Sequence, residues 1–274
     1  MSASSVQLIV NCDDIGIHPD ADFAAFELID AGLVTSLVLM APAPNFSQVT
    51  KLALERDLPV GLHLTLTNEW QDKLPWSPVL SSNHVPSLYN HKRLMWASGE
   101  EVVKHARIED VEKELRAQIL LAKEAGLILT HIDSHMLVLL QSDALTDIFL
   151  KLAKEFDLPL AFPKHLNSAL LQRPIMSGLQ SQGYRLPDVH FIQYNPDERE
   201  LDAGVAEINY KNMIEGMQPG INYMALHVAK ATKSLSGCIG DSGLRVSDYN
   251  IWASDGIHQY LREHGVTLVK ASVL

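Results

Sequence analysis

LIVNCDDIG, residues 8–16, is an apolar run closed by two adjacent carboxylates, and it decides how the rest of the chain is interpreted. A short apolar run that ends in aspartates and a glycine is typical of a buried strand followed by a turn. A segment of helical period at 20–31 comes next, and a second apolar run, VTSLVLM at 34–40, follows it. Strand, amphipathic helix and strand in this order favour a parallel sheet with helical crossovers.

The same alternation continues along the chain. The first strand is predicted at 6–11 and later ones at 60–67, 127–135, 158–162, 189–194, 221–228 and 266–270. Helices are predicted at 45–56, from a capping box at Ser98 and Glu101 to Gly126, and at 141–156, 203–217 and 248–264. A long insertion is predicted at about 68–98 and a loop at 229–247, and only one strand is predicted between 163 and 204. Units of this kind predict an α/β fold.

Length and composition limit the class of protein. The chain has 274 residues, 47% of them hydrophobic, which suits one α/β barrel, so a single domain over 1–274 is predicted. The net charge of −11 argues against nucleic acid or an anionic membrane as a partner, because both require a basic surface. Cys12 and Cys238 form no metal or disulfide pattern, and neither a signal peptide nor a membrane span is recognised. A cytoplasmic location is therefore expected.

Two strand segments carry histidines on one face. In VGLHLTLT, at 60–67, the alternation of side chains puts the valine and the leucines on one face. Gly61, His63, Thr65 and Thr67 share the other face. The same counting in THIDSH, at 130–135, puts His131, Asp133 and His135 on one side of the strand. Buried polar groups need partners, so these groups are expected to bind a metal or to hydrogen-bond one another.

The polar groups also share one edge of the predicted sheet. In parallel α/β folds ligand sites lie at the carboxyl ends of strands, where Asp13, Asp14 and His135 are predicted to fall. Asp14, His63 and His135 together form the candidate metal site. Each element also has a structural interpretation: paired aspartates often cap helices, and a strand histidine is often only a hydrogen-bonded core residue.

NCDDIG, VTSLVLM, VGLHLTLT and THIDSH, taken in this order, resemble the YdjC-type carbohydrate deacetylase family, whose members include chitooligosaccharide deacetylases. The resemblance implies a (β/α) TIM-like barrel, distorted or with seven units, and one divalent metal ion. It implies that Asp14, His63 and His135 are metal ligands and that Asp13 is the general base. A late histidine of the family corresponds to His227 in MALHV, which makes His227 a candidate general acid.

The chain departs from the commonest family pattern after the second histidine segment. Met136, Leu137 and Leu139 stand where many relatives carry further histidines, and His227 is followed by Val228 rather than proline. The three proposed ligands are kept. His131 and Asp133 are candidates for orienting the ligands or for contacting the substrate.

The resemblance predicts a metal-dependent hydrolase that removes the acetyl group from an N-acetylated sugar or short oligosaccharide. A divalent ion would activate water and polarise the amide carbonyl, while Asp13 accepts a proton. Carboxylate and imidazole ligands favour Zn²⁺, whereas the family resemblance makes Mg²⁺ an equal candidate. Two alternatives stay open: a metal-dependent amidase acting on a non-sugar acyl amide, and a catalytically inactive sugar-binding protein. The family is also compatible with a homodimer.

Other conspicuous residues have two interpretations. Trp70, Trp76 and Trp96 could stack on a sugar ring or staple the insertion to the body of the protein. The segment GDSG, at 240–243, resembles the nucleophile segment of trypsin-like proteases, but no matching histidine segment accompanies it, so a turn is predicted. His18, His84, His91 and His105 are predicted to be surface residues.

Overall fold

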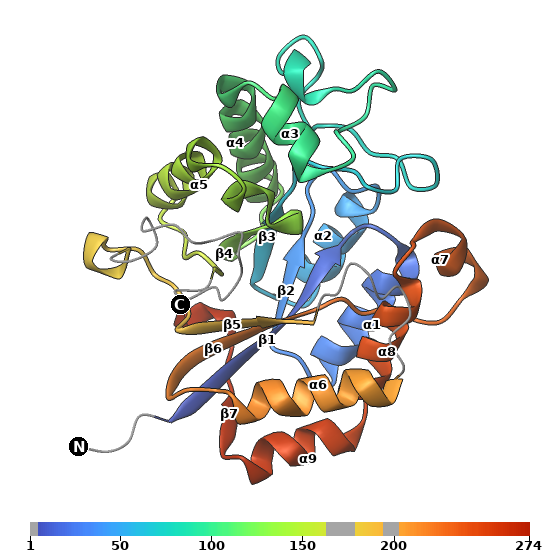
Figure 1. The fold of residues 1–274 in the computed structure, drawn as a ribbon, viewed down its shortest axis with the longest axis vertical. Helices are drawn as coiled ribbons and strands as arrows, with labels where there is room; N and C mark the ends of the chain where they lie inside the picture. Colours follow the sequence, from blue (N-terminus) through green and yellow to red (C-terminus); the bar gives the residue numbers. More distant parts are fainter. Residues whose placement is uncertain (1–4, 163–178, 194–202) are drawn as a thin grey trace.

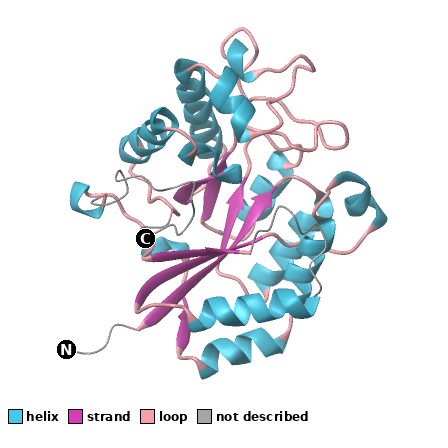
Figure 2. Cartoon of the chain, viewed as in Figure 1, coloured by secondary structure: helices cyan, strands magenta, loops and turns pink. Residues whose placement is uncertain are grey.

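Seven parallel strands form one curled sheet in the computed structural model, which describes residues 5–162, 179–193 and 203–274 (Figures 1 and 2). The strands are β1 (Val6–Ile15), β2 (Ser36–Leu39), β3 (Val60–Leu64), β4 (Leu129–Ser134), β5 (Val189–Ile192), β6 (Gly220–Leu226) and β7 (Val266–Leu268). Their order is β4-β3-β2-β1-β6-β5, and β7 pairs with β1. The predicted α/β fold with a parallel sheet is confirmed.

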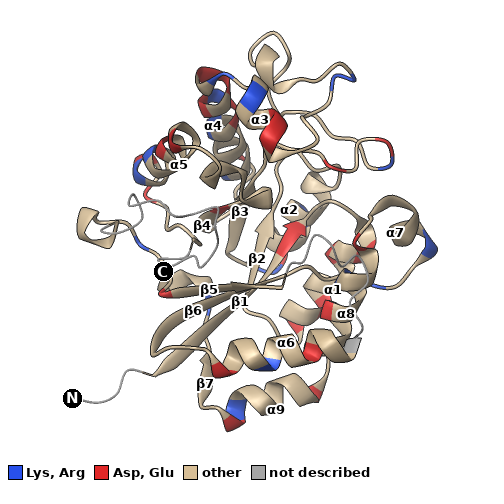
Figure 3. Ribbon diagram, in the orientation of Figure 1, with Lys and Arg blue, Asp and Glu red and all other residues tan. Residues whose placement is uncertain are grey.

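β1 is the centre of the sheet. It pairs along most of its length with β6, while its other edge is shared between β7 at the amino end and β2 at the carboxyl end. Because every pair is parallel, the carboxyl ends of the strands meet at one edge. The acidic residues at the head of the β1 arrow lie at this edge (Figure 3).

Helices follow most of the strands and cover the convex face of the sheet (Figure 2). They are α1 (Pro19–Asp30), α2 (Phe46–Leu54), α3 (Gly99–His105), α4 (Ile108–Glu124), α5 (Asp143–Glu155), α6 (Ala203–Glu215), α7 (Lys233–Cys238), α8 (Ser242–Trp252) and α9 (Asp255–Glu263). Among the residues that the structure describes, no helix is long and apolar enough to cross a membrane.

The two faces of β1 have different neighbours. Leu8, Val10 and Cys12 belong to the main hydrophobic core, which they share with the apolar sides of the helices. Ile9 points to the concave side, where it packs with Tyr223 and Ala225 of β6 in a small separate cluster. Apolar side chains therefore fill the concave side around the middle of β1. The polar groups lie beyond them, at the carboxyl ends of the strands.

The sheet is curled but not closed within the described residues. No ladder joins β4 to β5 in this part of the chain, and the strand predicted at 158–162 is reduced to a single bridge between Ile132 and Leu160. The expected barrel is thus seen as an open, curled sheet. The strand predicted at 189–194 ends at Ile192, and Tyr194 lies outside the described residues.

Two helix predictions were wrong in their boundaries. The predicted loop at 229–247 contains α7 and the start of α8, and the predicted helix at 248–264 is α8 and α9 separated at Ala253 and Ser254. The helix predicted from Ser98 to Gly126 is also two helices, because Ala106 and Arg107 adopt extended conformations.

Candidate metal centre

Asp13 and Asp14 lie at the carboxyl end of β1 and would point to opposite faces of a regular strand. The pairing of β1 with β2 shifts between Cys12 and Ile15, and Asp14 adopts a left-handed backbone with φ of 62°. Aspartate tolerates this conformation better than most residues. The bulge lets both carboxylates approach His63.

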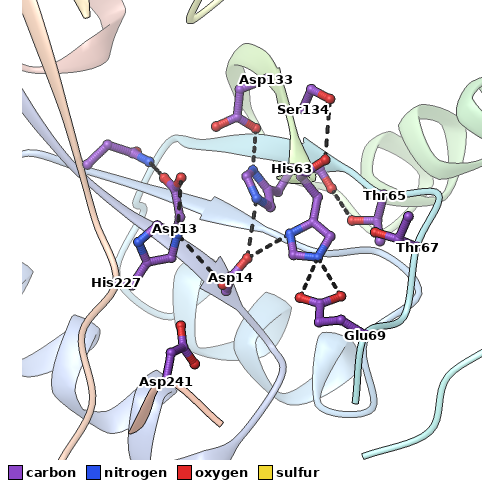
Figure 4. A network of polar contacts seen from close by, with 12 residues as sticks. Asp13, Asp14, His63, Thr65, Thr67, Glu69, Asp133, Ser134, His227 and Asp241 are labelled. Carbon is purple, nitrogen blue, oxygen red and sulfur yellow. Dashed lines mark hydrogen bonds and ion pairs between the residues drawn. The ribbon is translucent and has the colours of Figure 1, made fainter. Parts of the chain in front are cut away.

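His63 is held by the ladder between β3 and β4. Its Nε2 lies 3.3 Å from Oδ1 of Asp14, and its Nδ1 lies 2.6 Å from Oδ1 of Asp133 (Figure 4). His63 and Asp133 are direct partners across the two strands. The register therefore fixes the imidazole with Nδ1 on a carboxylate and Nε2 toward Asp14.

His135 follows the end of β4 and has the opposite nitrogen turned inward. Its Nδ1 lies 3.0 Å from Oδ1 of Asp14, and its Nε2 lies 3.0 and 3.1 Å from the two carboxylate oxygens of Glu69 (Figure 4). The next two residues, Met136 and Leu137, both have positive φ angles of about 50°. These two strained residues lie in the turn that follows His135, just beyond the end of β4 at Ser134.

The second oxygen of Asp14 binds a buried arginine. Nη2 of Arg245 donates to Oδ2 of Asp14 at 2.7 Å, and Nε of Arg245 donates to Asp241 at 3.0 Å. The Arg245 guanidinium lies over the ring of Trp70, 5.3 Å from its centroid. Only Oδ1 of Asp14 is thus left to face the two histidines.

The donor set fits a divalent cation. One carboxylate oxygen of Asp14 and one nitrogen each of His63 and His135 lie within 4.8 Å of one another, and all three residues are buried. Oδ1 of Asp14 is buried and accepts no hydrogen bond from any residue that the structure describes, although two imidazole nitrogens face it. A carboxylate and two imidazoles, each imidazole backed by a further carboxylate, are the usual surroundings of a bound transition ion.

The electrostatics of the cluster favour positive charge. Burial would raise the pKa of Asp14, but Arg245 and His135 outweigh it and lower that pKa well below its ordinary value. Burial likewise opposes protonation of His135, yet Glu69 and Asp14 raise its pKa to about 9. Asp133 and Asp14 also overcome burial and raise the pKa of His63. The negative charge that attracts protons to these imidazoles would equally attract a cation.

Asp13 and His227 lie beside the cluster. Nδ2 of Asn11 donates to Oδ1 of Asp13 at 2.6 Å, and Nε2 of His227 lies 4.0 Å from Oδ2 of Asp13 (Figure 4). Burial raises the pKa of Asp13 to about 8 against the opposing effect of His63. Burial lowers the pKa of His227 to about 4, so this imidazole is neutral near pH 7.

A second group of possible ligands, Asp13, His63 and Asp133, shares His63 with the first. In this group Nδ1 of His63 already contacts Asp133 at 2.6 Å, a short hydrogen bond. This hydrogen bond, which orients His63, explains why the three residues lie close together, so no second ion is needed.

His131 lies apart from the cluster. Its nitrogens contact the hydroxyl groups of Thr130 at 2.8 Å and Tyr223 at 3.1 Å, and its ring packs so closely on Gly61 that a Cβ there would lie 2.5 Å from it. The structure therefore places Asp133, but not His131, against a histidine of the candidate site, His63.

Four residues of the site were missed by sequence reasoning: Asn11, Glu69, Asp241 and Arg245. Glu69 continues the alternation of His63, Thr65 and Thr67, so the period of two was a usable signal for it. Asp241 and Arg245 stand four residues apart at the start of α8, a helical spacing that the loop prediction for 229–247 concealed.

Other predictions near the site have clear outcomes. Trp76 and Trp96 staple the insertion, since their indole nitrogens donate to backbone carbonyls of Thr67 and Ser87, both at 2.9 Å. Trp70 is half-buried against Arg245. The prediction that His18 is a surface residue was wrong: it is 6% exposed, and its ring accepts a hydrogen bond from the amide of Asp20 at the start of α1.

The fold and the site define a class of protein. It is an α/β protein with a parallel sheet, and a buried cluster of aspartate and histidine that could hold a metal ion lies at the carboxyl ends of the strands. The chain matches the YdjC-like protein family over residues 7–263. It therefore belongs to that family, and the resemblance predicted from the four sequence segments is confirmed.

Proteins named carbohydrate deacetylase are similar to this chain over nearly its whole length. One from Brevibacillus brevis is 31% identical and aligns over 98% of this chain and 100% of its own. Another from Enterococcus faecalis is 27% identical over 97% of both chains. A solved structure from Enterococcus faecalis, of a proposed cellobiose-phosphate cleavage protein, superposes with a TM-score of 0.83 at 24% identity, covering 98% of this chain and 99% of that one. This last likeness establishes the shared fold.

Proposed function

We propose that this protein is a metal-dependent hydrolase that removes the acetyl group from an N-acetylated sugar or short oligosaccharide. The observation that carries the proposal is the convergence of Oδ1 of Asp14 with one nitrogen each of His63 and His135. The full-length similarity to carbohydrate deacetylases supplies the substrate class.

Asp14, His63 and His135 would hold one divalent ion, Zn²⁺ or Mg²⁺. Bound there, the ion would polarise the amide carbonyl and lower the pKa of water. Imidazole ligands favour Zn²⁺ over Mg²⁺, which prefers oxygen ligands. Arg245 keeps Asp14 ionised and fixes its orientation through Oδ2.

Asp13 is the proposed general base. Asn11 orients its carboxylate, and positive charge at the neighbouring site would favour the ionised form that a base requires. Asp13 would accept a proton from the attacking water. His227 is neutral near pH 7 and 4.0 Å away, so it can take this proton and deliver it to the departing amine. Water and amide then yield acetate and a free amine.

Trp70 is the proposed contact for the sugar. It follows Glu69 directly, and its ring lies over the arginine that binds Asp14. Within the described part of the chain no backbone carbonyl accepts a hydrogen bond from its indole, whereas the indoles of Trp76 and Trp96 each have such a bond. The hydrophobic face of a sugar ring suits a half-buried indole.

Acetate release tests the proposal. The protein is stripped of metal with a chelator, reloaded with Zn²⁺ or Mg²⁺, and supplied with N-acetylated di- and trisaccharides and with a non-sugar acetyl amide. We expect release from the sugars only after reloading, and release at background level from the reloaded Asp14→Ala variant.

Three outcomes would contradict parts of this proposal. Unchanged release by Asp14→Ala would remove the metal assignment. A clear preference for the non-sugar amide would replace the substrate class, and absence of release from any amide by a metal-loaded protein would favour a sugar-binding role.

A further inference from the structure

A stripe of buried polar side chains runs along α4 on the side that faces the insertion. Asp110, Glu114 and Gln118 stand four residues apart, so they line one side of the helix, and they are 1%, 0% and 0% exposed. The apolar residues Val111, Leu115, Ile119 and Ala122 of the same helix belong to the main core. We propose that this polar stripe is a positioning device that holds Glu69 against the ligand histidine His135.

Gln118 fixes the point where the chain leaves β3. Its Oε1 accepts a hydrogen bond from the amide of Thr65 at 3.0 Å, and its Nε2 donates to the carbonyl of Thr65 at 2.7 Å. This pair imitates the two hydrogen bonds that a neighbouring strand would give. The backbone is thereby fixed four residues before Glu69.

Glu114 fixes the chain on the far side of Glu69. Its two oxygens accept hydrogen bonds from the amides of Val79 at 2.8 Å and Leu80 at 3.0 Å. Gln118 also donates to Glu114 at 2.9 Å, which joins the two anchors. Further along, Asp110 accepts hydrogen bonds from the amide and hydroxyl groups of Ser87.

Glu69 thus lies between two anchors of one helix. The intervening backbone is joined to the remainder of the insertion, because the amide of Asn68 donates to the carbonyl of Trp96 at 2.7 Å and Trp76 donates to Thr67. The carboxylate of Glu69 contacts Nε2 of His135, although Glu69 lies outside the strands.

The free-energy cost of burying polar side chains supports the role of the stripe. A carboxylate with no exposed surface costs free energy unless it is hydrogen-bonded, and apolar side chains at the same positions would pack at lower cost. Glu114 meets this cost with backbone amides that belong to an irregular segment and have no ladder to join. The stripe therefore determines the path of the loop that brings Glu69 to the metal centre.

The inference rests on the proposed metal site, because its consequence is an effect of Glu114 on metal affinity through Glu69. We would measure the dissociation constant for Zn²⁺ by calorimetry in the wild type, Glu114→Gln, Glu69→Gln and the double variant. A glutamine side chain at position 114 has one acceptor oxygen, whereas the amides of Val79 and Leu80 each need one. We expect Glu114→Gln to weaken binding about tenfold, within the range for residues that support a ligand.

The double variant gives the decisive comparison. If Glu114 acts through Glu69, the double variant binds Zn²⁺ no more weakly than Glu69→Gln alone, because the interaction is already lost. The matched control is Glu114→Gln combined with Asp133→Asn, which supports the other histidine. In this control double variant the two fold losses of Zn²⁺ affinity should multiply. Multiplying effects in the Glu114 and Glu69 pair, or wild-type affinity in Glu114→Gln, would overturn the proposal.

A metal-free measurement separates this inference from the proposed function. Hydrogen exchange of the segment 66–78 should change in Glu114→Gln and stay unchanged in Asp133→Asn, and the ring signals of His135 should change in Glu114→Gln. If the wild type binds no Zn²⁺, the metal assignment fails while these signals still test the position of Glu69. Unchanged exchange and ring signals in Glu114→Gln, or in Glu114→Asp should the first variant not fold, would refute the role of the stripe.

Discussion

The two histidines of the candidate metal site, His63 and His135, are supported in different ways. His63 has its orienting carboxylate, Asp133, directly across the ladder between β3 and β4. His135 has its carboxylate, Glu69, on an irregular segment beyond the end of β3. One support comes from the strand register, and the other depends on side chains of α4 that hold a loop in place.

The difference shows how a sheet and its loops share the construction of a site. A ladder positions a side chain through backbone hydrogen bonds that any sequence can form. A loop needs particular buried side chains to satisfy its backbone groups. The turn after β1 follows the same rule: Asp22 of α1 accepts hydrogen bonds from the amide of Gly16 at 2.6 Å and from Asn45 at 2.9 Å.

The largest expected difference between the two supports is in metal affinity. Asp133→Asn should weaken Zn²⁺ binding by about 100-fold and Glu69→Gln by about tenfold, the two ends of the range for such residues. The Asp133 side chain is 9% exposed and that of Glu69 is 19% exposed, so water can replace more of what Glu69 provides. Calorimetric titration of both variants measures the difference. An equal or larger loss in Glu69→Gln would show that the loop support matters as much as the ladder.

A smaller effect is expected from the substrate side of the insertion. Trp70→Ala should raise KM for an N-acetylated trisaccharide by roughly 2- to 10-fold with little change in kcat, the size of an aromatic contact worth about 0.5–1.5 kcal/mol. Steady-state kinetics measures both constants. Trp96→Phe is the control: it loses the bond to the carbonyl of Ser87 and should lower stability without changing KM. Equal KM values in all three proteins would exclude Trp70 as the sugar contact.

The smallest effect on activity is expected at the β1 turn. Burial raises the pKa of Asp22 from 3.8 to about 6, although hydrogen bonds from Asn45 and Gly16 oppose it. The folded state therefore binds this proton more tightly than the unfolded state does. The resulting stability is fully present below pH 3.8 and is lost as the pH rises through about 6.

Asp22→Asn removes this titration. The free energy of unfolding, measured in urea between pH 4 and 7, should fall less with rising pH in the variant than in the wild type, by roughly 1–3 kcal/mol over the range. Activity at neutral pH should be nearly unchanged, because the hydrogen bonds of Asp22 go to Gly16 and Asn45 and not to the candidate ligands or to Asp13. Parallel curves for the two proteins would contradict the assignment of the raised pKa to Asp22.

Much of the site could be predicted from alternation along the strands. Counting by two grouped His63 with Thr65 and Thr67, and His131 with Asp133 and His135. The structure brings His63, Asp133 and His135 together and leaves His131 apart, against Tyr223. The same count could have reached Glu69. The α7 helix and the start of α8 were missed because 229–247 contains glycines and little apolar period, and Arg245 was missed with them.

The sequence by itself determined the parallel α/β fold, the polar face of the two histidine-bearing strands and the edge at which the polar groups gather, because these follow from local periodicity and chain order. Only the tertiary structure decided that Asp14 turns through a bulge to face both histidines and that Arg245 occupies its second oxygen. These contacts join residues up to 231 positions apart, and no local pattern encodes them. They arise where separate elements pack and each buried charge must find its partner.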